Sequence, residues 1–293
     1  MRIVAAGVSG FIGSRLVAAL RERGDEVVTL VRRPPGGPSE VRWDPDGGEF
    51  DAAVLDGADA VINLCGAGVG DHRWTDSYRD TILSSRVRPT ALLAGACVER
   101  GVPALVNASA VGYYGHRGDE RLDELAPAGT SFLAGVCVRW ERAAAPAADG
   151  GVRVVHLRTG LVLGRGEGLL GQLDTVIRLG AGGRLGDGRQ WCPWISIEDE
   201  VAAIVHLVDT PVAGAVNLSA PEPVRNAELV RAIGRALHRP TPWIVPGVAL
   251  HLVVGAFADE ILHGQRAVPV ALEESGYRFR RPELADALRA ELG

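Results

Sequence analysis

The sequence predicts an α/β fold with a doubly wound, mostly parallel sheet. Short apolar runs alternate with amphipathic stretches up to about residue 160, which is the pattern of repeated strand–helix–strand units. After Gly160 the alternation gives way to a glycine-dense stretch and a helix-rich tail. We therefore expect a sheet domain over 1–160, completed by strands from about 190–220. Residues 161–293 would form mainly a smaller C-terminal substrate lobe and tail.

The composition is that of a globular protein, with 47% hydrophobic and 23% charged residues. A net charge of −5 argues against nucleic acid or an anionic membrane as the main partner. No apolar run is as long as a membrane span, and no signal-peptide pattern is present, so we expect a cytoplasmic protein. The cysteines and histidines are scattered without metal-ligand spacing, which predicts no metal site.

The first strand, over 2–6, runs into a glycine turn that opens an amphipathic helix over 11–23. The turn consists of Gly7, Val8, Ser9, Gly10, Phe11, Ile12 and Gly13. In a dinucleotide-binding Rossmann unit the first glycine permits the turn, the second admits a pyrophosphate, and the third allows close helix packing. The helix N-terminus then offers unpaired N–H groups to phosphate. A glycine turn without a ligand is the alternative, but the order of strand, helix and strand favours dinucleotide binding.

Two arginines, Arg32 and Arg33, end the second strand, which we expect over 26–31. They stand about 20 residues after the glycines, where an NAD-binding unit usually has an acidic residue for the ribose. An arginine there can pair with a 2′-phosphate and stack on adenine, so the sequence predicts NADP as the cofactor. The alternative is a solvated basic pair.

The next central strand, over 60–64, leads into the small residues Cys65, Gly66, Ala67 and Gly68. Small residues at the carboxyl end of a parallel strand allow a ligand to approach closely, although an ordinary turn has the same composition. A long helix follows over 75–99, capped by Thr75 and interrupted by Pro89. Arg86 on this helix is a candidate phosphate or adenine contact, or else a surface salt bridge.

The strand over 104–108 delivers Ser109 and the tyrosines Tyr113 and Tyr114 to the same edge of the sheet. A helix over 130–145 carries Glu141, and a strand over 152–157 ends at Arg158. Farther on, Trp191 and Trp194 follow the glycine-dense segment 180–188. Tryptophans beside glycines suit a lid that contacts substrate, with packing in the core as the competing interpretation.

Together these residues resemble the extended short-chain dehydrogenase/reductase superfamily, and within it the epimerase-family group with a C-terminal domain of unknown function. The resemblance implies NADP held by the glycine turn, by Arg32, by Leu64 to Gly66, by Arg86 and near Arg158. It also implies dimerisation through the two long helices. The matching motifs are GxxGxxG from Gly7, NLCG from Asn63, SAVGYYG from Ser109, Trp140-Glu141, RTGLVLG from Arg158, GGRLGDGRQWCPWI from Gly182, and GQRAVP from Gly264.

The chain departs from the superfamily at the catalytic Tyr-x-x-x-Lys, because it contains no lysine. By spacing, the tyrosine's place falls near Gly135 and the lysine's near Arg139, and an arginine cannot shuttle a proton. The usual serine position aligns with Ala110, one residue after Ser109.

Two functions stay open. The first is an NADP(H)-dependent oxidoreductase or epimerase-like enzyme acting on a small carbonyl or sugar-like substrate. In it Ser109 would bind the substrate oxygen and Tyr113 or Tyr114 would supply the proton, unless these tyrosines only pack. The second is a non-catalytic NADP(H)-binding sensor or regulatory module.

Overall fold

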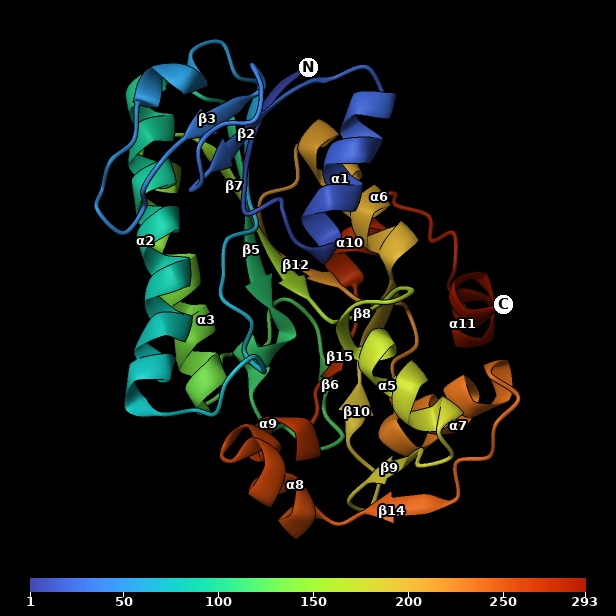
Figure 1. Cartoon of the computed structure of the whole chain (residues 1–293). Helices are drawn as coiled ribbons and strands as arrows, with labels where there is room; N and C mark the ends of the chain where they lie inside the picture. The colour runs from blue at the N-terminus through green and yellow to red at the C-terminus, as the bar shows by residue number, and fades with distance from the viewer.

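The computed structural model describes residues 1–293 and contains a central sheet of seven strands, in which every neighbouring pair is parallel (Figure 1). This confirms the predicted doubly wound α/β fold. Across the sheet the strands are β12 (Gly214–Leu218), β7 (Arg153–Thr159), β5 (Ala104–Ala110), β4 (Ala60–Asn63), β1 (Arg2–Ala6), β2 (Glu26–Val31) and β3 (Glu40–Arg42).

The strand order reverses beside β1. The chain goes from β1 to β2 and β3 on one side, and then returns to place β4, β5, β7 and β12 on the other. In an open parallel sheet such a reversal leaves a crevice at the carboxyl ends of the strands, where ligands bind. The glycine turn after β1 and the small residues after β4 both lie at this crevice, because β1 and β4 are paired.

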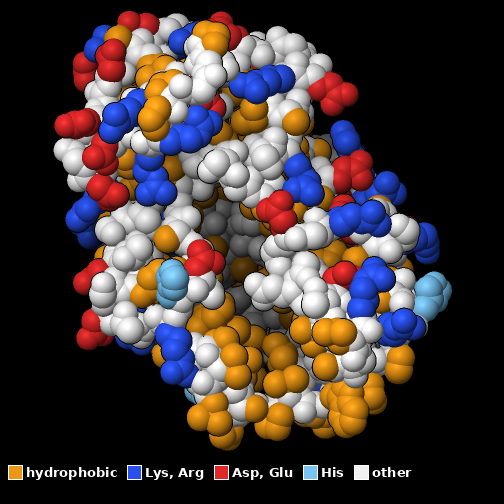
Figure 2. Space-filling model, in the orientation of Figure 1, with side chains coloured by type: hydrophobic (Ala, Val, Ile, Leu, Met, Phe, Trp, Pro, Cys, Tyr) orange, Lys and Arg blue, Asp and Glu red, His pale blue; other side chains and the backbone are white.

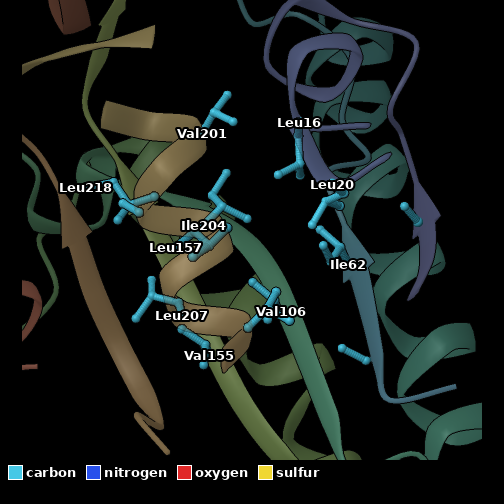
Figure 3. Close-up of a cluster of buried hydrophobic side chains, with 14 of the residues drawn as sticks. Leu16, Leu20, Ile62, Val106, Val155, Leu157, Val201, Ile204, Leu207 and Leu218 are labelled. Carbon is cyan, nitrogen blue, oxygen red and sulfur yellow. The ribbon is translucent and has the colours of Figure 1, made fainter. Parts of the chain in front are cut away.

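Alternate residues of the central strands face two helical layers, which is why these strands are apolar throughout. Ile3 and Ala5 of β1 face one apolar cluster, and Val4 and Ala6 face another. Figure 3 shows the first cluster, where leucines of α1 and α6 meet strand residues such as Val106 and Val155. The first layer contains α1 (Phe11–Glu22), α6 (Ile197–Asp209) and α10 (Val270–Glu274); the second contains α2 (Asp76–Arg100), α3 (Phe132–Ala143), α4 (Ala145–Asp149) and the short η1 (Ala52–Leu55).

Local signals set the ends of the long helices close to their predicted bounds. The Thr75 hydroxyl accepts a hydrogen bond from Tyr78 N at 3.2 Å, which caps α2, and Gly101 at φ 64° ends it. Ser131 caps α3 by accepting from Ala134 N at 3.3 Å. The two helices pack against each other (Figure 1), and dimerisation through them stays a prediction.

The C-terminal lobe has its own small core of apolar side chains, among them Leu170, Ile233 and Leu288. The segment 180–188, which we predicted to be a glycine-dense loop, contains a short strand, β9 (Gly183–Leu185). Two-stranded pairs join the lobe's elements: β8 (Leu161–Leu163) with β11 (Trp194–Ser196), β9 (Gly183–Leu185) with β14 (Trp243–Val245), β10 (Trp191–Cys192) with β13 (Val224–Arg225), and β6 (Arg121–Leu122) with β15 (Arg266–Ala267). Its helices are α5 (Gly168–Arg178), α7 (Asn226–Ala236) and α11 (Leu284–Leu292).

A pair of short helices, α8 (Gly247–Val254) and α9 (Phe257–Leu262), returns from this lobe to the sheet domain. The ring of Phe257 lies 5.3 Å from that of Trp74, centroid to centroid, and Leu133 N donates to the Glu260 carboxylate at 3.4 Å. The α8–α9 pair therefore spans from the lobe to the start of α2 and α3. None of the helices combines the length and the apolar character that crossing a bilayer requires.

Candidate active site

The three glycines of the first turn have three different environments. Gly7 has φ 72°, and a Cβ there would lie 2.5 Å from Cys65 N, so only glycine lets β1 approach the end of β4. A Cβ on Gly13 would lie 2.3 Å from Val8 Cα, so this glycine allows α1 to pack against its own turn. A Cβ on Gly10 would meet no atom within 4 Å. The turn therefore leaves open space at Gly10, directly before the N-terminus of α1.

The other residues of the turn divide between solvent and protein. Ser9 is exposed, and Ile12 packs against the main core. The Phe11 ring lies where a side chain on Gly164 would have to go, since a Cβ there would be 2.4 Å from Phe11 Cζ. Phe11 thus connects the glycine turn to the segment that follows β8.

Arg32 and Arg33 have opposite surroundings although they are adjacent. Arg33 makes two hydrogen bonds to the Glu40 carboxylate, at 2.7 and 2.6 Å. Arg32 is exposed and makes no hydrogen bond or ion pair. Burial raises the pKa of the Cys65 thiol to about 12, and the positive charge of Arg32 opposes that rise. Arg32 is thus the one of the pair whose charge is available at the crevice.

Arg86 lies under the small residues after β4. Its Cζ is 3.0 Å from the point where a Cβ on Gly66 would lie, and its guanidinium stacks over the Trp140 ring at 5.0 Å. Its only hydrogen bond goes to the carbonyl of Ile82, at 2.9 Å, and no carboxylate pairs with it. Burial lowers the pKa of Arg86, which is what a cation without a counterion experiences. The alternative interpretation, a surface salt bridge, is therefore not what the structure shows, and the guanidinium lies against the crevice lining at Gly66.

A buried polar network lies beneath this lining, and the sequence-based prediction missed it. Asn63 donates to Thr90 Oγ1 at 2.9 Å and to Asn107 Oδ1 at 2.7 Å, while Trp140 Nε1 donates to Thr90 at 3.1 Å. Asn63 Oδ1 accepts from Cys65 N at 3.2 Å and so fixes the turn after β4. The available signal is an asparagine within each of the two apolar strands β4 and β5.

Farther along the edge, Ser109 lies in a second network. Its hydroxyl donates to Glu141 Oε1 at 2.7 Å, and Arg158 holds both oxygens of Glu141 through bonds of 2.9 Å each. The side chains of Arg158 and Glu141 are only 5% and 12% exposed. The structure thus places Arg158 in an internal ion pair, with its guanidinium committed to protein partners.

Tyr113 and Tyr114 lie in the short helix η2 (Val111–Tyr114), but their hydroxyls differ. The Tyr114 side chain is fully buried, donates to Asn217 Oδ1 at 2.7 Å and accepts from Arg158 at 3.0 Å. Burial raises the pKa of Tyr114 to about 12, and the charge of Arg158 opposes the rise. The half-buried Tyr113 has its ring 3.5 Å from Arg158 Cζ, and its hydroxyl makes no hydrogen bond within the protein. Of the two tyrosines, only Tyr113 has a hydroxyl free to meet another molecule.

The two tryptophans also have different environments. Trp194 is 1% exposed, packs in the core of the C-terminal lobe, and donates to the Glu222 carbonyl at 3.1 Å, which favours the packing interpretation for this residue. Trp191 is half-buried and donates to Asp119 at 2.9 Å, and the Cζ atoms of Arg225 and Arg266 lie 3.8 and 4.7 Å from its ring centroid.

These features fit a dinucleotide carrying an additional phosphate. Gly10 leaves room at the helix N-terminus for a pyrophosphate, and the crevice holds two guanidiniums without acidic partners, Arg32 and Arg86. Figure 2 shows a hollow in the middle of this face, where the carboxyl ends of the central strands lie in Figure 1.

Known proteins resemble this chain in sequence and in fold. An epimerase-family protein of Mycobacterium bovis is 47% identical over 98% of this chain and 96% of its own length. The crystal structure of human epimerase family protein SDR39U1 with NADPH has a TM-score of 0.91 and 34% identity, covering 99% of this chain and 98% of that one. MoeE5 in complex with UDP-glucuronic acid and NAD has a TM-score of 0.81 and 26% identity, covering 100% and 98%.

Two family descriptions match the sequence itself. The NAD dependent epimerase/dehydratase family matches residues 3–219, and a domain of unknown function, DUF1731, matches residues 245–291. These matches confirm the resemblance drawn from the motifs. The chain belongs to the NAD dependent epimerase/dehydratase family.

Proposed function

We propose that the protein is an NADP(H)-dependent oxidoreductase or epimerase-like enzyme that acts on a small carbonyl or sugar-like substrate. The observation that carries the proposal is the exposed guanidinium of Arg32, which has no partner in the protein and stands at the end of β2, at the position where a 2′-phosphate would distinguish NADP from NAD. The NADPH bound by the human relative supports it.

The glycine turn from Gly7 to Gly13, Arg32, Leu64 to Gly66, and Arg86 would hold the cofactor. When bound, NADP(H) supplies or accepts the hydride. Arg33 instead orders the loop after β2 through Glu40, and Arg158 supports the catalytic edge through Glu141.

Tyr113 is the residue we assign to the substrate oxygen, because its hydroxyl has no partner in the protein. Ser109 and Tyr114 position it: Ser109 bonds to Glu141, and Glu141 and Tyr114 both bind the Arg158 guanidinium that lies against the Tyr113 ring. In this proposal Tyr113, whose ring lies against the buried Arg158 guanidinium, takes the place of the missing Tyr-x-x-x-Lys.

A non-catalytic NADP(H) sensor is the second candidate. The observation that favours it is that the hydroxyls of Ser109 and Tyr114 are both engaged within the protein. Oxidation of NADPH by members of a carbonyl panel would exclude it, whereas tight NADPH binding without turnover of any carbonyl class would support it.

The cofactor assignment is tested by comparing Arg32→Ala with Arg33→Ala. Calorimetric titration should show that Arg32→Ala weakens NADPH binding about 10- to 100-fold and leaves NADH binding nearly unchanged, because only NADPH carries the 2′-phosphate. Arg33→Ala should have a much smaller effect, since Arg33 is engaged by Glu40. Equal losses for NADPH and NADH in Arg32→Ala would remove the basis of the proposal.

A further inference from the structure

An exposed apolar surface covers one end of the C-terminal lobe. Val248, Leu252 and Val253 of α8 are 75%, 73% and 72% exposed, and Trp243 and Ile244 of β14 are 60% and 52% exposed. We call these five residues the apolar rim. No residue of α8 is buried, so the helix is apolar without contributing to any core. Large contiguous apolar surface on a soluble protein usually marks a binding site.

The rim is continuous with the hollow at the carboxyl edge of the sheet. Figure 2 shows hydrophobic side chains gathered below the hollow, over α8 and β14 as labelled in Figure 1. Leu262 of α9 connects the two sides of this opening, because Cβ atoms on Gly186 and on Gly247 would each lie 3.1 Å from it. The end of α9 also lies beside the loop that follows Tyr114, because the His263 and His116 ring centroids are 4.3 Å apart.

Several contacts hold the rim in place. Arg73, before α2, donates to the Leu252 carbonyl, and His251 lies 3.0 Å from the Asp259 carboxylate across the helix pair. On the other side, Trp243 Nε1 donates to the Gly180 carbonyl at 2.8 Å. The rim is thus a fixed surface tied to both parts of the protein.

The charged residues in and around the rim help to decide what kind of molecule binds there. Residues 243–257 include no acidic or basic side chain except His251. Segments that lie on a bilayer usually add lysine or arginine, which anionic headgroups attract. Arg73, Arg184 and Arg231 lie beside the rim. The rim's own five side chains are uncharged, and the rim adjoins a hollow that a bilayer cannot enter. An uncharged aliphatic chain attached to a smaller polar head fits both properties.

We propose that the rim binds the aliphatic chain of a lipophilic carbonyl substrate, whose carbonyl head enters the hollow toward Tyr113. This rests on the proposed function, because it names the substrate class of that site. It sets the protein apart from MoeE5, whose bound ligand is a nucleotide sugar.

The experiment measures chain-length dependence of binding without requiring turnover. The full-length protein is titrated with 1-butanol and with 1-decanol, each at concentrations where it stays monomeric. Full burial would raise affinity about fourfold per methylene; half-burial gives about twofold, or roughly 60-fold over the six added methylenes. In Val248→Asp/Leu252→Asp this preference should fall below about fivefold. Leu125→Asp is the matched control, because it places the same charge at another exposed apolar residue outside the rim. Leu125 is 93% exposed and follows Glu124, which contacts β12.

Equal binding of the two alcohols by the unaltered protein would overturn the proposal. Sedimentation of the protein with lipid vesicles, or a rim-dependent dimer, without a decanol preference would also overturn it by naming another occupant. A decanol preference in a protein that oxidises NADPH with no carbonyl compound would instead contradict the proposed function while supporting the apolar site.

Discussion

The two halves of the sheet's carboxyl edge differ in whether their arginine side chains have acidic partners. On the half formed by β1, β2 and β4, Arg32 and Arg86 have no acidic partner. On the half formed by β5, β7 and β12, the cation Arg158 is saturated by Glu141, Tyr114 and the Glu124 carbonyl. The same residue type therefore has different roles at one edge.

The difference indicates which half needs another molecule for completion. The partly buried Arg86 guanidinium has lost hydration without gaining a carboxylate, so an anionic ligand would stabilise it, whereas the exposed Arg32 is free to pair with one. A saturated network gains nothing from a ligand, but it fixes the geometry around it. We infer that the first half binds the cofactor, whereas the second is a rigid support that presents Tyr113.

The largest expected effect comes from breaking the saturated half. Glu141→Gln keeps the shape of the side chain and leaves Arg158 buried without its counterion, which typically costs about 3–5 kcal/mol. Urea denaturation should show a loss of that order in the free energy of unfolding. Glu198→Gln is the control, because its ion pairs with Arg280 and Arg281 are exposed and each is worth about 1 kcal/mol or less. Equal losses in the two variants would refute the distinction between the halves.

Glu200 of α6 is an unsatisfied group next to the saturated network, where it contacts Thr159 of β7. It is fully buried and accepts from Thr159 Oγ1 at 2.9 Å, but its Oε2 has no partner. Burial raises its pKa from 4.5 to about 8, with the Thr159 hydrogen bond opposing the rise. The folded state therefore holds a proton between these values that the unfolded state has released.

The contribution of Glu200 to stability should accordingly fall as the pH rises from about 4.5 to 8 and then level off, because in that range Glu200 binds a proton in the folded state and not in the unfolded state. Glu200→Gln removes this dependence. At pH 7 the variant should be more stable than the unaltered protein by up to about 3 kcal/mol, and the two should agree near pH 4.5. Thermal unfolding of both proteins across this range is the measurement, and parallel pH profiles would show that Glu200 is ionised in the fold.

The sequence predicted the local geometry of the half formed by β1, β2 and β4 better than that of the half formed by β5, β7 and β12, and the reason is physical. The glycine turn works through backbone conformation and close approach over a few consecutive residues, so its spacing is readable in the sequence. The long helices were readable for the same reason, since Thr75 caps α2 locally.

The half formed by β5, β7 and β12 depends on contacts between distant segments. Tyr114 meets Asn217 across 103 residues and Ser109 meets Glu141 across 32, so no local pattern separates the free Tyr113 from the engaged Tyr114. Trp191 and Trp194, which are close in sequence, are equally hard to tell apart from the local pattern. Their exposure depends on the packing of α7 and β15, and the sequence left core packing and substrate contact open for both.

The smallest expected effects distinguish the two tyrosines. Tyr113→Phe removes a hydroxyl that has no partner in the protein, so the free energy of unfolding should change by less than about 0.5 kcal/mol. Turnover of a carbonyl substrate should fall about 100-fold, the lower range for loss of a proton donor. Tyr114→Phe, the matched control, leaves buried Asn217 Oδ1 without its donor and should cost about 1–2 kcal/mol of stability. If turnover fell more in Tyr114→Phe than in Tyr113→Phe, the free hydroxyl would not be the one that meets the substrate.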